Sequence, residues 1–264
     1  MQIIGYGAAI LIGISLGLIG GGGSILTVPV LVYLFGINPL LSTSYSLFIV
    51  GSTSLVGAFN NYRKGLVRIK TSLLFGLSSV TAVFLTRKLI IPAIPKKIAV
   101  IGTFTITASI FTMILFAILM VIASVSMIRN GSIKENVTDD KKTNLFRLLL
   151  YGTVLGFVTG LLGAGGGFLL IPMLVVIMKL PMKEAVGTSL FIIALNSLIG
   201  FTGDLGHFSI EWRFLLTITA IAIAGIFAGS AIAKKISGER LKKGFGWFVL
   251  LMGIYIMGKE IFFR

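Results

Sequence analysis

The chain contains one pattern of glycine, proline and leucine twice: GLIGGGGSILTVPVL at residues 17–31 and GLLGAGGGFLLIPML at residues 160–174. Laid over each other with an offset of 143 residues, the two stretches share glycines, the proline and the final leucine. The offset returns downstream, where Ser-Leu-Phe at residues 46–48 is repeated at residues 189–191. The pattern predicts an internal duplication, in which each copy is interrupted by a glycine cluster.

The composition indicates the solvent in which this duplicated chain folds. Of its 264 residues, 56% are hydrophobic and only 12% are charged, whereas soluble globular chains carry about 25% charged residues. Mean hydropathy is +1.05. Cysteine is absent, which excludes a disulfide framework, a thiolate nucleophile and Cys-ligated metal centres. We expect an all-α protein, a polytopic transmembrane helical bundle.

Apolar segments of about 18–20 residues are needed to cross the hydrocarbon core. The sequence predicts eight long spans and two shorter half-spans, one after each glycine cluster. The long spans are expected at 2–19, 41–59, 71–86, 98–128, 145–162, 185–203, 213–233 and 244–263, and the half-spans at 24–36 and 167–178. The expected organisation is a first repeat at 1–128, a polar linker at 129–144 and a second repeat at 145–264, each repeat with about five helical segments.

The basic residues indicate how the two repeats are oriented, because Lys and Arg concentrate in cytoplasmic loops. If each glycine-broken unit enters and leaves on one side, each repeat has an odd number of crossings and the repeats are inverted. One side then carries 16 of the 23 Lys and Arg and the other carries 7. If the unit were a single discontinuous span, the charges would divide almost evenly. We therefore predict inverted repeats in the cell membrane, with a cytoplasmic linker and both termini outside.

The glycine clusters predict irregular backbone at membrane depth, since a glycine costs about 1 kcal/mol relative to alanine in a helix. Such backbone is tolerated where it lines a cavity, and two facing half-helix N-termini would offer N–H groups to an anion. The alternative is that these glycines only permit close helix packing. Hydroxyl and amide side chains nearby would add neutral donors, although Ser and Thr can bond their own backbone instead. The candidate substrate-binding residues are Gly20, Gly21, Gly22, Gly23, Ser24, Ser46, Thr53, Asn60, Gly163, Gly165, Gly166, Gly167, Thr188, Ser189 and Asn196.

Three ionisable residues near span ends are candidates for coupling or gating. Asp204 and His207 form an acid–histidine pair that could carry a coupling proton, although a pair in a loop can simply be solvated. Arg63 could draw anions to the cytoplasmic mouth or act only in setting topology. Arg87 is interpreted as a topology determinant of the same kind.

Several function classes are disfavoured. The sequence lacks a phosphate loop, a His-Glu-x-x-His motif and a nucleophile elbow, so we expect neither an enzyme nor an ATP-driven pump, and no cofactor or metal. The net charge of +15 first suggests nucleic acid, but the basic residues fall in short breaks between apolar runs, as in membrane proteins. The expected partners are a small anionic solute and the lipid bilayer, not nucleic acid, and a homodimer is left open.

The paired glycine signatures and the Ser-Leu-Phe that follows each resemble the sulfite exporter TauE/SafE family, also called the 4-toluene sulfonate uptake permease superfamily. The resemblance covers about residues 5–260. It implies a prokaryotic membrane transporter whose usual substrates are sulfite or organosulfonates. Family members often carry an acidic residue beside a Trp after the third helix of each repeat. Here residues 211–212, Glu-Trp, keep that pair, while residues 68–70, Arg-Ile-Lys, do not.

We therefore expect a secondary transporter that moves a small sulfur oxyanion by alternating access between inverted halves. A passive anion channel, a membrane-embedded enzyme and a membrane subunit of a larger complex remain the alternatives. The small number of ionisable residues at membrane depth argues against the enzyme.

Overall fold

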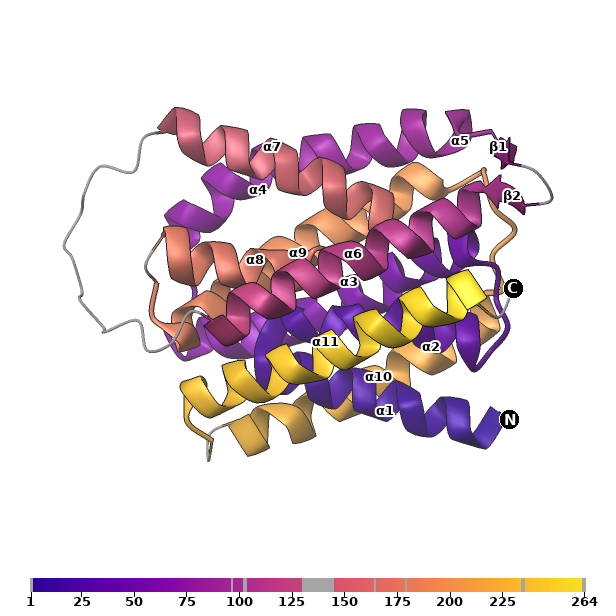
Figure 1. The fold of residues 1–264 in the computed structure, drawn as a ribbon. Helices are drawn as coiled ribbons and strands as arrows, with labels where there is room; N and C mark the ends of the chain where they lie inside the picture. Colours follow the sequence, from indigo (N-terminus) through magenta and orange to yellow (C-terminus); the bar gives the residue numbers. More distant parts are fainter. Residues whose placement is uncertain are drawn as a thin grey trace.

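The chain folds into a bundle of helices that run roughly side by side (Figure 1). The computed structural model describes residues 2–95, 97–101, 104–129, 145–163, 165–178, 180–233 and 236–262, so that all of the predicted linker except Arg129 lies outside the described residues. The elements are α1 (Gln2–Ile19), η1 (Gly20–Leu26), α2 (Thr27–Tyr33), α3 (Pro39–Arg63), α4 (Ile69–Leu85), η2 (Thr86–Ile90), α5 (Ile91–Ala93), β1 (Lys97–Ile101), β2 (Phe104–Thr107), α6 (Ala108–Arg129), α7 (Leu145–Leu162), α8 (Gly167–Pro172), η3 (Met173–Ile177), α9 (Met182–Asp204), α10 (Trp212–Ala233) and α11 (Gly238–Phe262).

The helical membrane character predicted from the sequence is confirmed, and the count of eight long spans stays a prediction. Within the described ranges, five helices are long and apolar enough to cross a membrane: Pro39–Arg63, Ile69–Ala93, Ala108–Val125, Met182–Asp204 and Trp212–Ala233. Shorter apolar helices cover Gly5–Ile19, Ser24–Tyr33 and Leu148–Leu162. The chain is therefore a multi-pass membrane protein.

The predicted span 98–128 is wrong in its first third. Residues 97–101 and 104–107 pair as two antiparallel strands, β1 with β2, and the helix begins only at Ala108. The preceding helix ends at Ala93, and Pro95 prevents it from continuing. The β-branched residues that follow favour strands over helix. Uniform hydropathy concealed this change of secondary structure.

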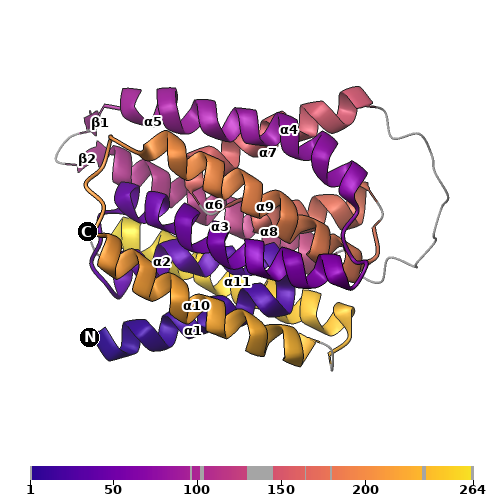
Figure 2. The same cartoon turned by 180° about the vertical axis from the view of Figure 1, so that it is seen from behind.

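Glycines allow close contact within two helix pairs, and the residues in contact in one pair are related to those in the other by the 143-residue offset. A Cβ added to Gly13 on α1 would overlap the backbone of Ala222 on α10. A Cβ added to Gly156 on α7 would overlap the backbone of Ser79 on α4, and Ser79 precedes Ala222 by 143 residues. The α1–α10 and α7–α4 pairs therefore pack in equivalent ways, with α3 against α9 between them (Figure 2).

The two glycine clusters break the helices as predicted. Gly20 and Gly163, the first glycine of each cluster, adopt left-handed φ angles of 67° and 65°. Side chains other than glycine are strained in this region. The breaks meet at the centre, because a Cβ on Gly21 would lie 2.5 Å from the Cα of Gly167. Backbone packs against backbone here.

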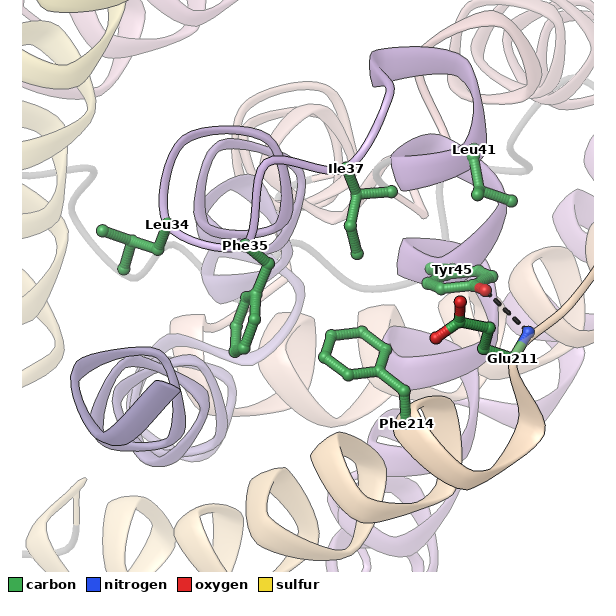
Figure 3. Close-up of a pocket in the computed structure, with 7 residues that line it drawn as sticks. All are labelled: Leu34, Phe35, Ile37, Leu41, Tyr45, Glu211 and Phe214. Carbon is green, nitrogen blue, oxygen red and sulfur yellow. Dashed lines mark hydrogen bonds between the residues drawn. The ribbon is translucent and has the colours of Figure 1, made fainter. Parts of the chain in front are cut away.

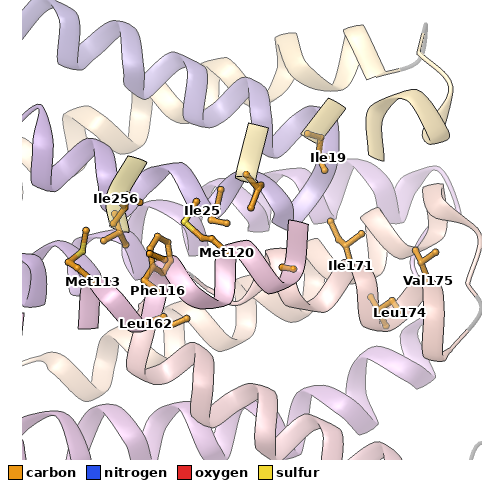
Figure 4. Packing of buried hydrophobic residues seen from close by; sticks show 14 of the residues in the cluster. Ile19, Ile25, Met113, Phe116, Met120, Leu162, Ile171, Leu174, Val175 and Ile256 are labelled. Carbon is orange, nitrogen blue, oxygen red and sulfur yellow. The ribbon is translucent and has the colours of Figure 1, made fainter. Parts of the chain in front are cut away.

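The largest buried cluster surrounds this crossing point. It joins residues of η1 and α2 to α6, α8 and α11, among them Ile25, Phe116, Ile171 and Ile256 (Figure 4). Both chain termini lie at one end of the bundle, and the end of α6 and the start of α7 lie at the other (Figure 1). We call these the terminal end and the linker end. As a result, α1 and α7 run in opposite directions.

Candidate transport site

Most of the predicted hydroxyl groups bond backbone within their own helix or segment. Ser24 donates to the carbonyl of Gly21 at 2.7 Å, Thr53 to Ile49 at 2.6 Å, and Ser189 to Val186 at 2.9 Å. Satisfied in this way, these three hydroxyls have no unmatched donor for a solute in this conformation.

Several other buried polar groups have no hydrogen-bond partner within the part of the chain that the structure describes. The hydroxyl of Ser46, a predicted site residue, is one of them. The hydroxyl of Ser197 is another, and a Cβ on Gly165 would lie 2.6 Å from it. Asn196 donates to the Ser79 hydroxyl at 2.6 Å, while its own carbonyl oxygen is unmatched. Because buried polar groups are nearly always hydrogen-bonded, each of these groups is available to a polar guest.

A fully buried ion pair lies beside the second glycine break. Its cation is Arg87, which the sequence analysis interpreted as a topology determinant. The Nη1 of Arg87 is 3.1 Å from Oδ2 of Asp204, and the two side chains are 0% and 1% exposed. Nη1 also donates to the Thr43 hydroxyl at 3.0 Å. A Cβ on Gly163 would overlap Nη2 of the same guanidinium. Charge at membrane depth is expensive and is typical of functional positions.

Asp204 forms its ion pair with Arg87 and not with His207, the partner expected from the sequence. Asp204 ends α9 and points to Arg87, whereas His207 is exposed and its backbone N–H donates to the Asp204 carbonyl at 3.1 Å. The signal in the sequence was that an apolar run resumes directly after Arg87 and Lys88, from Leu89 to Ile94. Arg63 is exposed at the linker end, with its guanidinium 5.9 Å from the Phe59 ring centre. Asn60, one turn before the end of α3, is half-buried.

Two hydrogen bonds at opposite ends of the bundle repeat the 143-residue offset. The N–H of Arg68, in the α3–α4 loop, donates to Oγ1 of Thr188 on α9 at 3.1 Å. The N–H of Glu211, before α10, donates to Oη of Tyr45 on α3 at 2.8 Å. Arg68 precedes Glu211, and Tyr45 precedes Thr188, by the same 143 residues. Predicted site residue Thr188 thus belongs to a contact at the linker end.

The side chains around these two bonds differ. At the linker end, the Arg68 guanidinium donates two hydrogen bonds to the Glu184 carboxylate, with Nε–Oε2 at 2.6 Å and Nη2–Oε1 at 3.3 Å. At the terminal end, the residue equivalent to Glu184 is Leu41, which cannot pair with Glu211. The Arg68–Thr188 contact is therefore reinforced by an ion pair that the equivalent Glu211–Tyr45 contact lacks.

A cavity of about 350 Å³ lies at the terminal end instead. It is lined by Leu34, Phe35, Ile37, Leu41, Tyr45, Glu211 and Phe214 (Figure 3). Its walls are apolar and aromatic, and its charged group is the carboxylate of Glu211. An anion would be repelled by that carboxylate, so this cavity is not an anion site in itself.

The fold and these buried polar groups define a class: a polytopic helical membrane protein with buried polar residues in its interior. The family model described as sulfite exporter TauE/SafE matches residues 6–256, and the chain belongs to this family of membrane transporters. It is not an enzyme family.

Named relatives agree with this assignment. The chain is 25% identical to a "Probable membrane transporter protein" of Xylella fastidiosa, over 98% of this chain and 95% of the relative. It is 27% identical to one of Methanocaldococcus jannaschii, over 97% and 93%, and 26% identical to YunE of Bacillus subtilis, over 93% of both. No solved structure matches the chain significantly.

Proposed function

We propose that this protein is a secondary active transporter of small sulfur oxyanions, such as sulfite or organosulfonates, and works by alternating access between two inverted repeats. The observation that carries the proposal is the unequal closure of two equivalent ends. The Arg68–Thr188 and Glu211–Tyr45 hydrogen bonds occupy equivalent positions in the two repeats. At the linker end the Arg68–Glu184 ion pair reinforces the contact, whereas at the terminal end a cavity lies beside it.

The inverted relation is supported by the equivalent glycine contacts of the α1–α10 and α7–α4 pairs and by the opposite directions of α1 and α7. In this proposal residues 1–128 and 145–264 are the repeats. The linker end, where the basic loops gather, faces the cytoplasm and both termini lie outside. The conformation described is closed at the cytoplasmic end.

The anionic nature of the solute is supported by three features. The family description names sulfite. Buried polar groups without a partner in the described ranges are present in the interior, and the buried Arg87 guanidinium lies against Gly163. Among the described residues, no group of three or more His, Asp or Glu could hold a metal ion, so the interior does not favour a divalent cation. In this proposal the glycines at 20–23 and 163–167 bring the repeats together, and Ser46 and Asn196 face the solute.

Reconstituted proteoliposomes provide the test. We expect saturable uptake of radiolabelled sulfite or methanesulfonate that depends on the protein and competes with other sulfur oxyanions. Conductance at channel rates without saturation would instead favour a passive anion channel. Absence of flux for every anion, under both a pH and a voltage gradient, would refute the transport proposal.

A further inference from the structure

We propose that Arg87 binds the transported anion through the edge of its guanidinium formed by Nε and Nη2, and that the preferred ligand is a singly charged oxyanion. This inference rests on the proposed function and adds the anchoring residue and the charge of the substrate. Nε and Nη2 have no hydrogen-bond partner within the described ranges, although the side chain is fully buried.

The geometry of the free edge identifies the ligand class. Asp204 and Thr43 both use the remaining nitrogen, Nη1, at 3.1 Å and 3.0 Å. Nε and Nη2 present two nearly parallel N–H groups, the arrangement that matches two oxygens of a carboxylate, sulfonate or phosphate. An anion could therefore bind while the contact with Asp204 is kept.

The energetic argument is that a charged donor left unmatched in the interior is costly. A buried unsatisfied polar group costs about 1–3 kcal/mol, and more when it is charged. Gly163 lies so close to Nη2 that a Cβ there would overlap this nitrogen, so only glycine permits the contact. A guanidinium kept half-unmatched beside a glycine break is explained by a ligand that comes and goes.

The charge of the pair sets the preference among anions. Arg87 and Asp204 together are neutral, so a monoanion adds one net negative charge to the interior and a dianion adds two. The desolvation penalty rises steeply with net charge. We therefore expect methanesulfonate to bind more tightly than sulfate, although both present the same oxygens.

The pair joins one residue of each repeat, and the equivalent positions do not form a second copy of it. With the 143-residue offset, Arg87 corresponds to Ser230 and Asp204 to Asn61. The Asn61 amide donates to the Gly57 carbonyl of its own helix at 2.8 Å. One anion per chain is the expected stoichiometry.

Binding measurements on purified protein separate this role from a purely structural one. Arg87→Lys keeps a positive charge beside Asp204 but removes the two-pronged edge. The double variant Arg87→Gln/Asp204→Asn removes both charges together, so that neither is left buried without its partner. It provides the test if Arg87→Lys does not fold. Lys88→Gln is the matched control, because Lys88 is exposed and adjacent in sequence. Size-exclusion profiles and melting temperatures without ligand identify the folded variants.

Thermal stabilisation by methanesulfonate, with sulfate and chloride for comparison, gives the readout, since a ligand that binds the folded form raises its stability. Wild type and Lys88→Gln should bind methanesulfonate equally, and both Arg87 variants should bind it at least ~10-fold more weakly. A folded Arg87 variant with unchanged affinity would overturn the site while leaving transport intact. Equal affinity for sulfate would overturn the monoanion preference. A wild type that neither binds nor transports any anion would instead refute the proposed function.

Discussion

The Arg68–Glu184 ion pair offers the sharpest test of how the two ends are controlled. The change is Glu184→Gln, which keeps the size of the side chain and removes its charge. If the pair holds the linker end closed, its loss should shift the population toward a conformation open at that end and closed at the terminal end.

The expected size follows from exposure and geometry. Arg68 is 60% exposed and Glu184 is 23% exposed, so solvent screens the pair, and its two N–O contacts place it at the upper end for surface ion pairs, about 1 kcal/mol. A free-energy change of that size shifts a two-state ratio about fivefold. The absence of native cysteine permits clean labelling of single-cysteine variants.

Two reporters read the two ends in wild-type and Glu184→Gln backgrounds. Thr71→Cys lies two residues after the α4 start, and Phe214→Cys lies at the equivalent position in the wall of the terminal cavity. Labelling with a membrane-impermeant maleimide should rise up to about fivefold at Thr71→Cys and fall at Phe214→Cys.

The matched control changes an ion pair whose two residues lie on the same helix. Glu239→Gln removes the exposed pair with Lys243 within α11, where the two groups are 3.1 Å apart, and should leave both reporters unchanged. Equal labelling in Glu184→Gln and wild type, or an increase at both ends together, would refute the reasoning, since alternating access requires opposite changes.

Two further predictions concern the centre of the bundle. Gly167→Ala should destabilise the protein by about 1–3 kcal/mol, because its Cβ would overlap the Gly21 carbonyl; Gly7→Ala, in open space on α1, should be neutral or stabilising, and equal melting temperatures for both variants would contradict the close contact. Asn196→Leu should cost about 1–3 kcal/mol if the bond to Ser79 is structural, because the Ser79 hydroxyl loses its donor. An unchanged melting temperature with weakened methanesulfonate binding would instead assign the amide to the solute.

Much of the fold could be predicted because hydropathy and glycine clustering report directly on membrane depth and helix breaks. Every predicted apolar segment contains a helix, and α1 and α7 end immediately before Gly20 and Gly163, where the sequence predicts helix breaks. The paired strands at 97–101 and 104–107 were missed, since their residues are as apolar as those of a span.

The site was harder to predict, because it depends on which side chains meet across helices. Ser24 and Thr53 have the right chemistry, but their hydroxyls are occupied by their own segment or helix. Arg87 looked like a loop residue, since a basic pair after an apolar run usually marks a membrane boundary. Only the packing of η2 against α9 reveals that Arg87 is buried against Asp204.

Counterflow in proteoliposomes tests the central claim most directly. Vesicles loaded with excess unlabelled methanesulfonate are diluted into a trace of the labelled anion, with no pH or voltage gradient. A carrier whose single site faces one side at a time should accumulate label transiently above its equilibrium level. Simple equilibration of the label without overshoot, in vesicles that do conduct the anion, would show that both ends open at once and would contradict alternating access.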